Sequence, residues 1–176
     1  MELLTLLKRY TPSDENERMA REVTIQFVEE NKLAFERSLL FGHVTASALL
    51  LNKDKTRFLL MHHRKLNKWF QVGGHCDGDH DTLRVAMKEA AEESGIDKVE
   101  PISREVFDID VHLIPQNKGI PAHFHFDVRY LLKTSASDEL VINGESQALR
   151  WFSFDEELPT AEESVLRMIR KCRASL

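Results

Sequence analysis

The chain has 176 residues, of which 42% are hydrophobic and 30% charged, and its formal net charge is −5. This composition is typical of one globular domain with a core of its own, and the acidic balance argues against bulk binding to nucleic acid or anionic membranes. Two cysteines, Cys76 and Cys172, are too few for a disulfide framework, and no segment resembles a signal peptide or membrane anchor, so we expect a cytoplasmic protein.

An amphipathic helix is the first expected element. Thr11 offers a cap and Pro12 a first helical position. Apolar side chains then recur four residues apart at Met19, Val23 and Phe27, which predicts a helix with an apolar face that ends near residue 31.

A hairpin and a second helix follow. Residues 43–51 are rich in strand formers, residues 52–55 are typical of a turn, and residues 57–61 resume the apolar run. Helical periodicity then extends over residues 81–94 and stops at Gly95, where helices favour a left-handed residue.

The last third of the chain predicts strands and a closing helix. Strand character covers residues 99–111, and residues 123–132 and 149–154 predict further strands. Thr160 and Glu163 have the spacing of a capping box. The helix behind them has the apolar stripe Val165, Met168, Ile169 and Cys172. Antiparallel hairpins between a few helices indicate an α+β fold, with a mixed sheet flanked by helices.

Three glutamates of the second helix share one face. Glu89, Glu92 and Glu93 are related by steps of three and four residues, and the apolar positions of the same helix lie on another arc. Taken alone, such a face is usually solvated surface. The pair Gly73-Gly74 just before the helix permits close backbone approach, however, and oxygen-rich sites suit hard cations such as Mg²⁺ or Mn²⁺.

The spacing around this helix resembles a known signature. Gly74, five residues, position 80, seven residues and then Lys88-Glu89-Ala90-Ala91-Glu92-Glu93-Ser94-Gly95-Ile96 is similar to the box of the Nudix hydrolases. The resemblance implies an α/β/α sandwich, with residues 1–40 as an N-terminal helical extension packed on a hydrolase domain of residues 41–176. It also implies divalent-metal hydrolysis of a diphosphate.

The resemblance also suggests roles for individual residues. By position, the Gly73 carbonyl and the carboxylates of Glu89, Glu92 and Glu93 match the family's usual metal ligands. Glu145, shortly before Trp151, is placed like a further acid of the family. Glu92, Glu93 or Glu145 would then be the catalytic base.

Two positions depart from the box. His80 stands where the family has glutamate, and Lys88 where it has arginine. In the family these two residues help to brace the glutamates, so a rearranged bracing is expected. Asp79 or Asp81 could supply the missing acid, and the sequence does not decide between these alternatives.

A basic cluster precedes the box. Arg64 and Lys65 could be the counter-charge of a substrate phosphate, and Trp69 could stack on a base. An exposed hairpin loop is an equally good interpretation of the same residues.

A second polar group lies on the strand at residues 123–130. His123, His125, Asp127 and Arg129 alternate with apolar residues and therefore share one strand face. His125 and Arg129 are substrate-binding candidates if this face lines the cleft, and solvent-exposed residues otherwise. Two histidines beside His75 raise the question of zinc, which the sequence does not favour because no cysteine or carboxylate stands at a settled ligand spacing.

The leading functional hypothesis is a pyrophosphohydrolase that uses Mg²⁺ or Mn²⁺. Its substrate would be a small nucleoside diphosphate linked to another moiety, and the protein would be a monomer or homodimer. One alternative is a catalytically weakened nucleotide sensor. An enzyme similar to isopentenyl diphosphate isomerase is disfavoured, because its nucleophilic cysteine would fall near Gly73 and Cys76 comes three residues too late.

Overall fold

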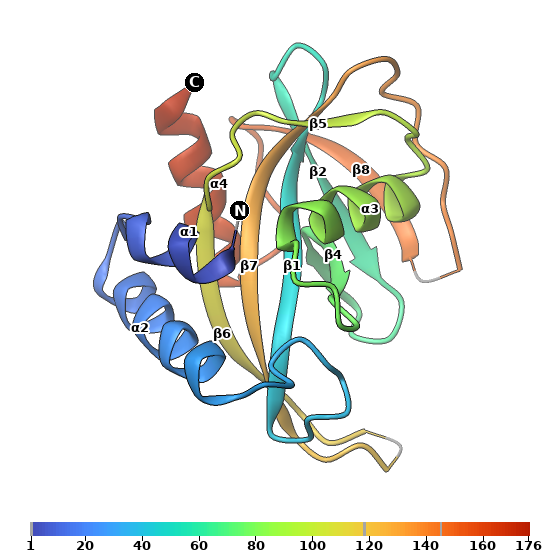
Figure 1. Ribbon diagram of the computed structural model, residues 1–176. Coiled ribbons are helices and arrows are strands. Elements are labelled where there is room, and N and C mark those ends of the chain that lie inside the picture. The colour runs from blue at the N-terminus through green and yellow to red at the C-terminus, as the bar shows by residue number, and fades with distance from the viewer. Residues whose placement is uncertain (1, 118, 145) are drawn as a thin grey trace.

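The computed structural model describes residues 2–117, 119–144 and 146–176. Figure 1 shows helices on both sides of a curled sheet. The helices are α1 (Leu3–Arg9), α2 (Glu15–Glu30), α3 (Thr82–Ser94) and α4 (Glu163–Ser175). The strands are β1 (Gly42–Leu51), β2 (Arg57–His63), β3 (Lys68–Phe70), β4 (Val72–His75), β5 (Val99–Pro101), β6 (Asp108–Ile114), β7 (His123–Thr134) and β8 (Ser146–Ser153).

The sheet is mixed, and its centre is a long parallel pair. Strand β1 runs parallel to β7, in register from Gly42 opposite Phe124 to Leu51 opposite Lys133. The other pairings are antiparallel: β1 with β2 and β4, β2 with β3 and β8, and β7 with β5 and β6. The predicted α+β class with a mixed sheet is confirmed.

The two faces of the sheet bury two separate cores. Alternate side chains of β1 point to opposite faces, so Val44 and Ala46 pack with the helices α1 to α3, and Leu49 and Leu51 pack with α4. In Figure 1 the first three helices lie in front of the sheet and α4 lies behind it. This arrangement is the three-layer sandwich that the resemblance implied.

The first helix was not predicted, and it contributes to the larger core. Leu3, Leu6 and Leu7 of α1 are buried. The ring of Phe27 on α2 stacks on Phe126 of β7 at a centroid distance of 3.9 Å. The N-terminal segment therefore covers part of the front face of the sheet.

The predicted start of α2 and two of its three predicted apolar positions were wrong, whereas its end near residue 31 and the burial of Phe27 are confirmed. The helix begins at Glu15, and the side chain of Asp14 caps it by accepting a hydrogen bond from the Glu17 amide at 2.8 Å. Met19 and Val23 are 50% and 44% exposed. The buried residues are Glu17, Ala20, Thr24 and Phe27. A polar face is buried because the Glu17 carboxylate receives hydrogen bonds from Tyr10, Ser13 and Lys171, which offset its desolvation.

Two further predictions need correction. The strand expected over residues 99–111 is interrupted, and its parts β5 and β6 pair with successive segments of the same edge of β7. The capping box of α4 does not form, because Glu162 is the N-cap and makes no side-chain cap, while Thr160 Oγ1 accepts a hydrogen bond from the Glu162 amide at 3.3 Å.

The remaining expected elements are present. The first hairpin closes at residues 52–55, and α3 ends at Gly95, which is left-handed with a φ of 73°. The stripe of Val165, Met168, Ile169 and Cys172 is buried as predicted.

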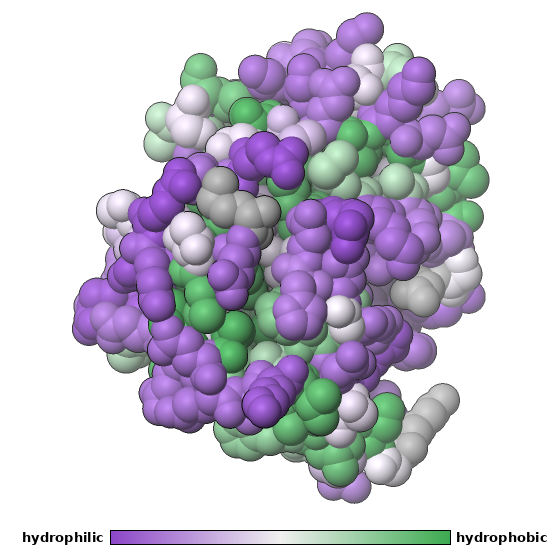
Figure 2. All heavy atoms as spheres, in the orientation of Figure 1, coloured by the Kyte–Doolittle hydropathy of each residue, from purple (hydrophilic) through white to green (hydrophobic). Residues whose placement is uncertain are grey.

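The surface view is largely hydrophilic, with hydrophobic side chains at the bottom (Figure 2). That end contains the segment before β1 and the β6–β7 hairpin, where Leu40, Phe41, Leu113 and Ile120 are exposed. In the described part of the chain, no helix combines the length and apolar character needed to cross a bilayer.

Candidate active site

The glycine pair of β4 lies against the acidic face of α3. The amide of Gly73 donates a hydrogen bond to Oε2 of Glu93 at 2.8 Å, and Glu93 is only 5% exposed. Gly73 lies opposite Ser47 in the β1–β4 pairing, where a Cβ on Gly73 would be 2.2 Å from the Cβ of Ser47. A glycine is therefore required for β4 to come this close to β1.

Gly74 leaves room for the second glutamate. A Cβ at this position would be 2.4 Å from Oε2 of Glu89. The Glu89 side chain is 18% exposed, so its carboxylate is partly sheltered beside the glycine backbone. Two carboxylates of α3 thus contact the glycine pair, Glu93 at the Gly73 amide and Glu89 in the space that the absent side chain of Gly74 leaves open.

Glu92 is the most exposed of the three glutamates. Its side chain is 58% exposed, and the Lys88 ammonium lies 3.6 Å from Oε2 of Glu92 and 3.7 Å from Oε1 of Glu89. Lys88 therefore supplies positive charge to the acidic face from the position where the family has arginine. It acts as a single charge rather than as a planar fork.

The donor set of this face suits a hard cation. Two of the three carboxylates contact the backbone of the glycine pair, and Mg²⁺ needs only one or two carboxylates because water and phosphate complete its shell. In the described ranges the oxygens of the three glutamates do not lie as close to one another as the ring nitrogens of His43, His123 and His125 do. Glu145, predicted as a further acid, lies outside the described residues.

Position 80 lies at the other end of α3. The His80 ring stacks on Phe35 at a centroid distance of 4.2 Å, and it borders an open depression with Asp77 and Asp79. Asp79 binds the Arg84 guanidinium at 2.6 Å, while Asp81 caps α3 by accepting from the Arg84 amide. Both aspartates are thus engaged with Arg84.

The basic cluster lies on the β2–β3 hairpin. Arg64 and Lys65 are exposed in its turn, and Arg64 donates to the Ser146 carbonyl at the start of β8 at 3.1 Å. Trp69 stacks on His62 at a centroid distance of 5.0 Å and meets the edge of Phe152. The indole is half-buried by these contacts, and the two cations remain on the surface.

A buried polar network covers the α4-facing side of β1 and β7. Asp127 accepts hydrogen bonds from Thr45 at 3.1 Å, Ser47 at 2.8 Å, Gln71 at 3.2 Å and Arg129 at 2.7 Å. Because Asp127 is only 3% exposed, this network ties β1, β7 and the residue before β4 together.

Arg129 belongs to that network and not to an open cleft. It is 2% exposed, and its guanidinium pairs with Asp108 at 3.3 Å and Asp110 at 3.4 Å as well as with Asp127. Burial opposes ionisation of Asp110, but hydrogen bonding to His112 and the Arg129 charge outweigh it and lower the pKa of Asp110 to about 2. This geometry disfavours Arg129 as a substrate ligand.

His125 lies in a group of histidine side chains at the β1–β7 pair. Its ring centroid is 4.9 Å from His43, 5.0 Å from His75 and 5.2 Å from His123. Burial and the neighbouring imidazoles lower the pKa of His125 to about 2, and burial together with the Arg37 charge lowers the pKa of His75 to about 4. The His75 and His125 rings are therefore neutral at physiological pH.

Sequence reasoning missed His43, Gln71 and Asp108. His43 stands at the start of an apolar strand, and only the parallel pairing places it opposite His125. Asp108 accepts hydrogen bonds from Arg167 of α4 at 2.7 Å and 3.0 Å, a contact between distant segments that no local pattern indicates. Alternation on β7 was the only available signal, and it did identify the shared face of His123, His125, Asp127 and Arg129.

Solved structures share this fold. A NUDIX-family hydrolase from Clostridium perfringens is 22% identical with a TM-score of 0.56, covering 76% of this chain and 98% of that chain. An Ap4A hydrolase from C. elegans is 20% identical with a TM-score of 0.59, covering 75% and 96%. An ADP-ribose pyrophosphatase from Streptococcus suis is 24% identical with a TM-score of 0.53, covering 75% and 90%.

The family model describes the same region of the chain. No curated protein matches the sequence. The model of the NUDIX domain, however, matches residues 42–172, which include all eight strands, α3 and the glycine pair. The chain therefore belongs to the NUDIX domain family.

Proposed function

We propose that the protein hydrolyses a nucleoside diphosphate linked to another moiety, with Mg²⁺ or Mn²⁺ as the required metal. The observation that carries this proposal is the packing of the glycine pair against the acidic helix. Gly73 binds Glu93 directly, and Gly74 leaves the space that the Glu89 carboxylate occupies. Both contacts place carboxylate oxygens beside backbone whose carbonyl oxygens could also bind the metal.

The proposed metal ligands are the Gly73 carbonyl and the carboxylates of Glu89, Glu92, Glu93 and Glu145. A divalent cation held there would neutralise the diphosphate oxygens and stabilise the charge that develops on them. The chain's part is to fix the carboxylates. Glu93 is held by the Gly73 amide, and Lys88 limits the repulsion between Glu89 and Glu92.

The proposed proton acceptor is a glutamate of the same group. Glu92, Glu93 and Glu145 are the candidates, and of the two that the structure describes, Glu92 has the freer access to water. A carboxylate that takes a proton from the attacking water makes it a better nucleophile towards phosphorus. The bond from phosphorus to the bridging oxygen then breaks, and that oxygen leaves with the second phosphate.

The proposed substrate contacts are Arg64, Lys65 and Trp69, because Nε2 of His125, the fourth candidate, is buried among other histidines. Arg64 and Lys65 are exposed cations that suit phosphate oxygens, and the Trp69 ring suits a base. The neighbours named for Ap4A and ADP-ribose support a small nucleotide as the substrate class. We extend the proposal to a cytoplasmic monomer or homodimer without bulk affinity for nucleic acid or membranes, in line with the net charge of −5.

The test is a substrate panel with the purified full chain. Ap4A, ADP-ribose, dihydroneopterin triphosphate, nucleotide sugars and nucleoside triphosphates are incubated with Mg²⁺, Mn²⁺ or EDTA, and the products are separated by chromatography. We expect metal-dependent cleavage of at least one diphosphate linkage. Nucleotide binding without any cleavage would instead establish the sensor alternative.

An isomerase mechanism is not favoured by the cysteines. Cys76 is 4% exposed, and burial, together with the charges of nearby aspartates, raises the pKa of its thiol. The thiolate that such a mechanism needs is therefore disfavoured at this position.

A further inference from the structure

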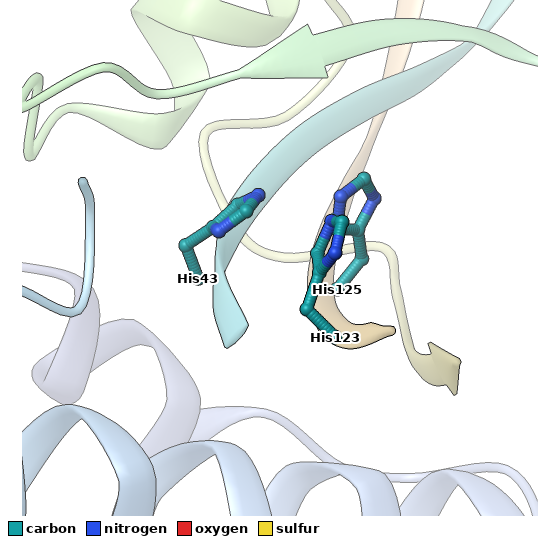
Figure 3. A group of neighbouring side chains, drawn as sticks. All are labelled: His43, His123 and His125. Carbon is teal, nitrogen blue, oxygen red and sulfur yellow. The ribbon is translucent and has the colours of Figure 1, made fainter. Parts of the chain in front are cut away.

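The histidines of β1 and β7 converge on one space. One ring nitrogen from each of His43, His123 and His125 lies within 4.8 Å of the others. Figure 3 shows the His43 side chain, from β1, facing the His123 and His125 side chains, from β7. The parallel register causes this convergence, because it places His43 directly opposite His125 and points both to the same face of the sheet.

The imidazole nitrogens of this group lack the partners that buried polar atoms normally have. His43 is 4% exposed, and neither of its ring nitrogens makes a hydrogen bond with any described residue. The Leu39 carbonyl is near enough to favour the charged ring slightly, without reaching hydrogen-bond geometry. Nε2 of His125 is equally buried and equally without a partner. A buried polar atom without a partner destabilises the fold, so an unrecognised ligand is a physical explanation for the burial of these nitrogens.

The third histidine is already oriented. Nδ1 of His123 lies 2.9 Å from the Pro121 carbonyl, which can only accept, so Nδ1 bears the proton and Nε2 keeps its lone pair. A metal-binding histidine typically donates its second nitrogen to a backbone carbonyl or carboxylate in this way. Nδ1 of the nearby His112 contacts Asp110 at 3.0 Å in a similar arrangement.

We propose that His43, His123 and His125 form a second metal site, which binds a divalent transition metal such as Zn²⁺ and is separate from the carboxylate site on α3. Neutral imidazoles are typical ligands of Zn²⁺, whereas Mg²⁺ prefers oxygen. Three histidines leave a fourth position for water or an anion. Zinc–nitrogen bonds of about 2.0–2.1 Å would draw the three nitrogens to about 3.4 Å from one another, which is within reach of side-chain rotation.

His75 borders the site and links it to the glycine pair. Its ring lies 5.1 Å from His43 and 5.0 Å from His125 between centroids, and it follows Gly73 and Gly74 on β4. Along a strand, His75 and Gly73 are about 7 Å apart. The second metal would therefore stand next to the candidate active site, with His75 between the two.

Cobalt is the probe for this site, because Co²⁺ replaces Zn²⁺ and absorbs visible light when it is bound by nitrogen at low coordination number. The full-length protein is treated with EDTA, dialysed and titrated with Co²⁺ in the presence of excess Mg²⁺. We expect one equivalent of Co²⁺ to bind with visible bands and to be displaced by Zn²⁺.

Matched variants assign the ligands. The substitutions His43→Gln, His123→Gln and His125→Gln should each weaken Zn²⁺ binding at least about 100-fold, because loss of an outer-shell partner alone costs 10- to 100-fold. His75→Gln should have a smaller effect. His62→Gln on β2 is the histidine control, and Glu92→Gln is the control for the carboxylate site, and both should bind as the wild type does. Circular dichroism identifies any variant that does not fold, and the other ligand variants then take its place.

Three results would overturn the proposal. The first is a wild-type protein that binds neither Co²⁺ nor Zn²⁺ at millimolar concentration. The second is equal binding by the wild type and the folded histidine variants. The third is a loss of Co²⁺ binding in Glu92→Gln with retention in His43→Gln, which would assign the metal to the carboxylates. None of these readouts depends on hydrolase activity, so they test this site independently of the proposed function.

Discussion

The Gly73 amide donates a hydrogen bond to the Glu93 carboxylate at 2.8 Å and so joins the strand before the acidic helix to the last turn of that helix. The neighbouring glutamates differ sharply in exposure, since Glu93 is 5% exposed as a residue and the side chain of Glu92 is 58% exposed. Adjacent carboxylates on one helix are therefore expected to respond differently to the same substitution.

Glu92→Gln and Glu93→Gln separate catalysis from stability. Both should lower metal-dependent turnover about 100-fold or more, because each removes a charge from the proposed metal site while keeping the shape. Only Glu93→Gln should also lower the melting temperature, since it weakens a buried charge-assisted hydrogen bond. Turnover assays with Mg²⁺ and thermal melts measure both effects, and the exposed Glu157→Gln is the control. Near-normal turnover of both variants would refute the assignment.

Alanine substitutions of Gly73 and Gly74 should affect different properties, the first mainly stability and the second mainly metal binding. Gly73→Ala places a methyl group 2.2 Å from the Cβ of Ser47, so the strands must separate, and we expect about 1–3 kcal/mol less stability. Gly74→Ala meets the flexible end of Glu89 at 2.4 Å, so it should raise the Mg²⁺ concentration for half-maximal activity with a smaller loss of stability. Denaturant unfolding and metal titration measure these effects.

Gly144→Ala is the control for both variants, because a Cβ there meets no atom within 4 Å. If Gly73→Ala were as stable as this control, the close approach of β4 to β1 would be incorrect.

Substitutions at positions 80 and 88 should affect the metal requirement differently. Lys88 lies within 4 Å of Glu89 and Glu92, so Lys88→Gln removes a charge that competes with the metal and should lower the Mg²⁺ requirement several-fold. His80 stacks on Phe35 at the opposite end of α3, so His80→Gln should leave the metal titration superimposable on that of the wild type. A shifted titration of His80→Gln would restore the interpretation that this residue braces the glutamates.

Glu17 should make the fold sensitive to acid. Burial opposes its ionisation, but the hydrogen bonds from Lys171, Ser13 and Tyr10 outweigh this and lower the pKa of Glu17 to about 2. Because this pKa is lower in the folded state, the carboxylate stabilises the protein above about pH 4.5, and this contribution is lost as the pH falls towards 2.

Glu17→Gln should therefore cost about 3 kcal/mol at pH 7, since it removes one of the two carboxylates that pair with the largely buried Lys171 and leaves only Asp108. The difference from the wild type should shrink as the pH falls from 4.5 towards 2. Urea unfolding at several pH values measures it, with Glu22→Gln on the exposed side of α2 as the control. A difference that does not change over this range would show that Glu17 is not ionised in the fold.

The sequence by itself determined the elements whose signals are local. Period-two alternation identified the polar face of β7, helical periodicity and Gly95 defined α3, and the box predicted both the family and the acidic face. These patterns are readable because the spacing of neighbouring residues decides which side chains share a face. The apolar stripe of α4 could be predicted for the same reason.

Tertiary contacts decided what the local patterns could not. The buried face of α2 centres on Glu17, whose partner Lys171 comes from the opposite end of the chain, so the four-residue spacing of apolar side chains predicted only Phe27 of that face correctly. The sequence suggested Arg129 as a substrate ligand, but in the folded protein its guanidinium pairs with Asp108, Asp110 and Asp127. The histidine group likewise depends on the parallel register of β1 and β7, which brings His43 to His125. Long-range pairing is set by which surfaces can be buried together, and a single sequence does not encode that choice in any local spacing.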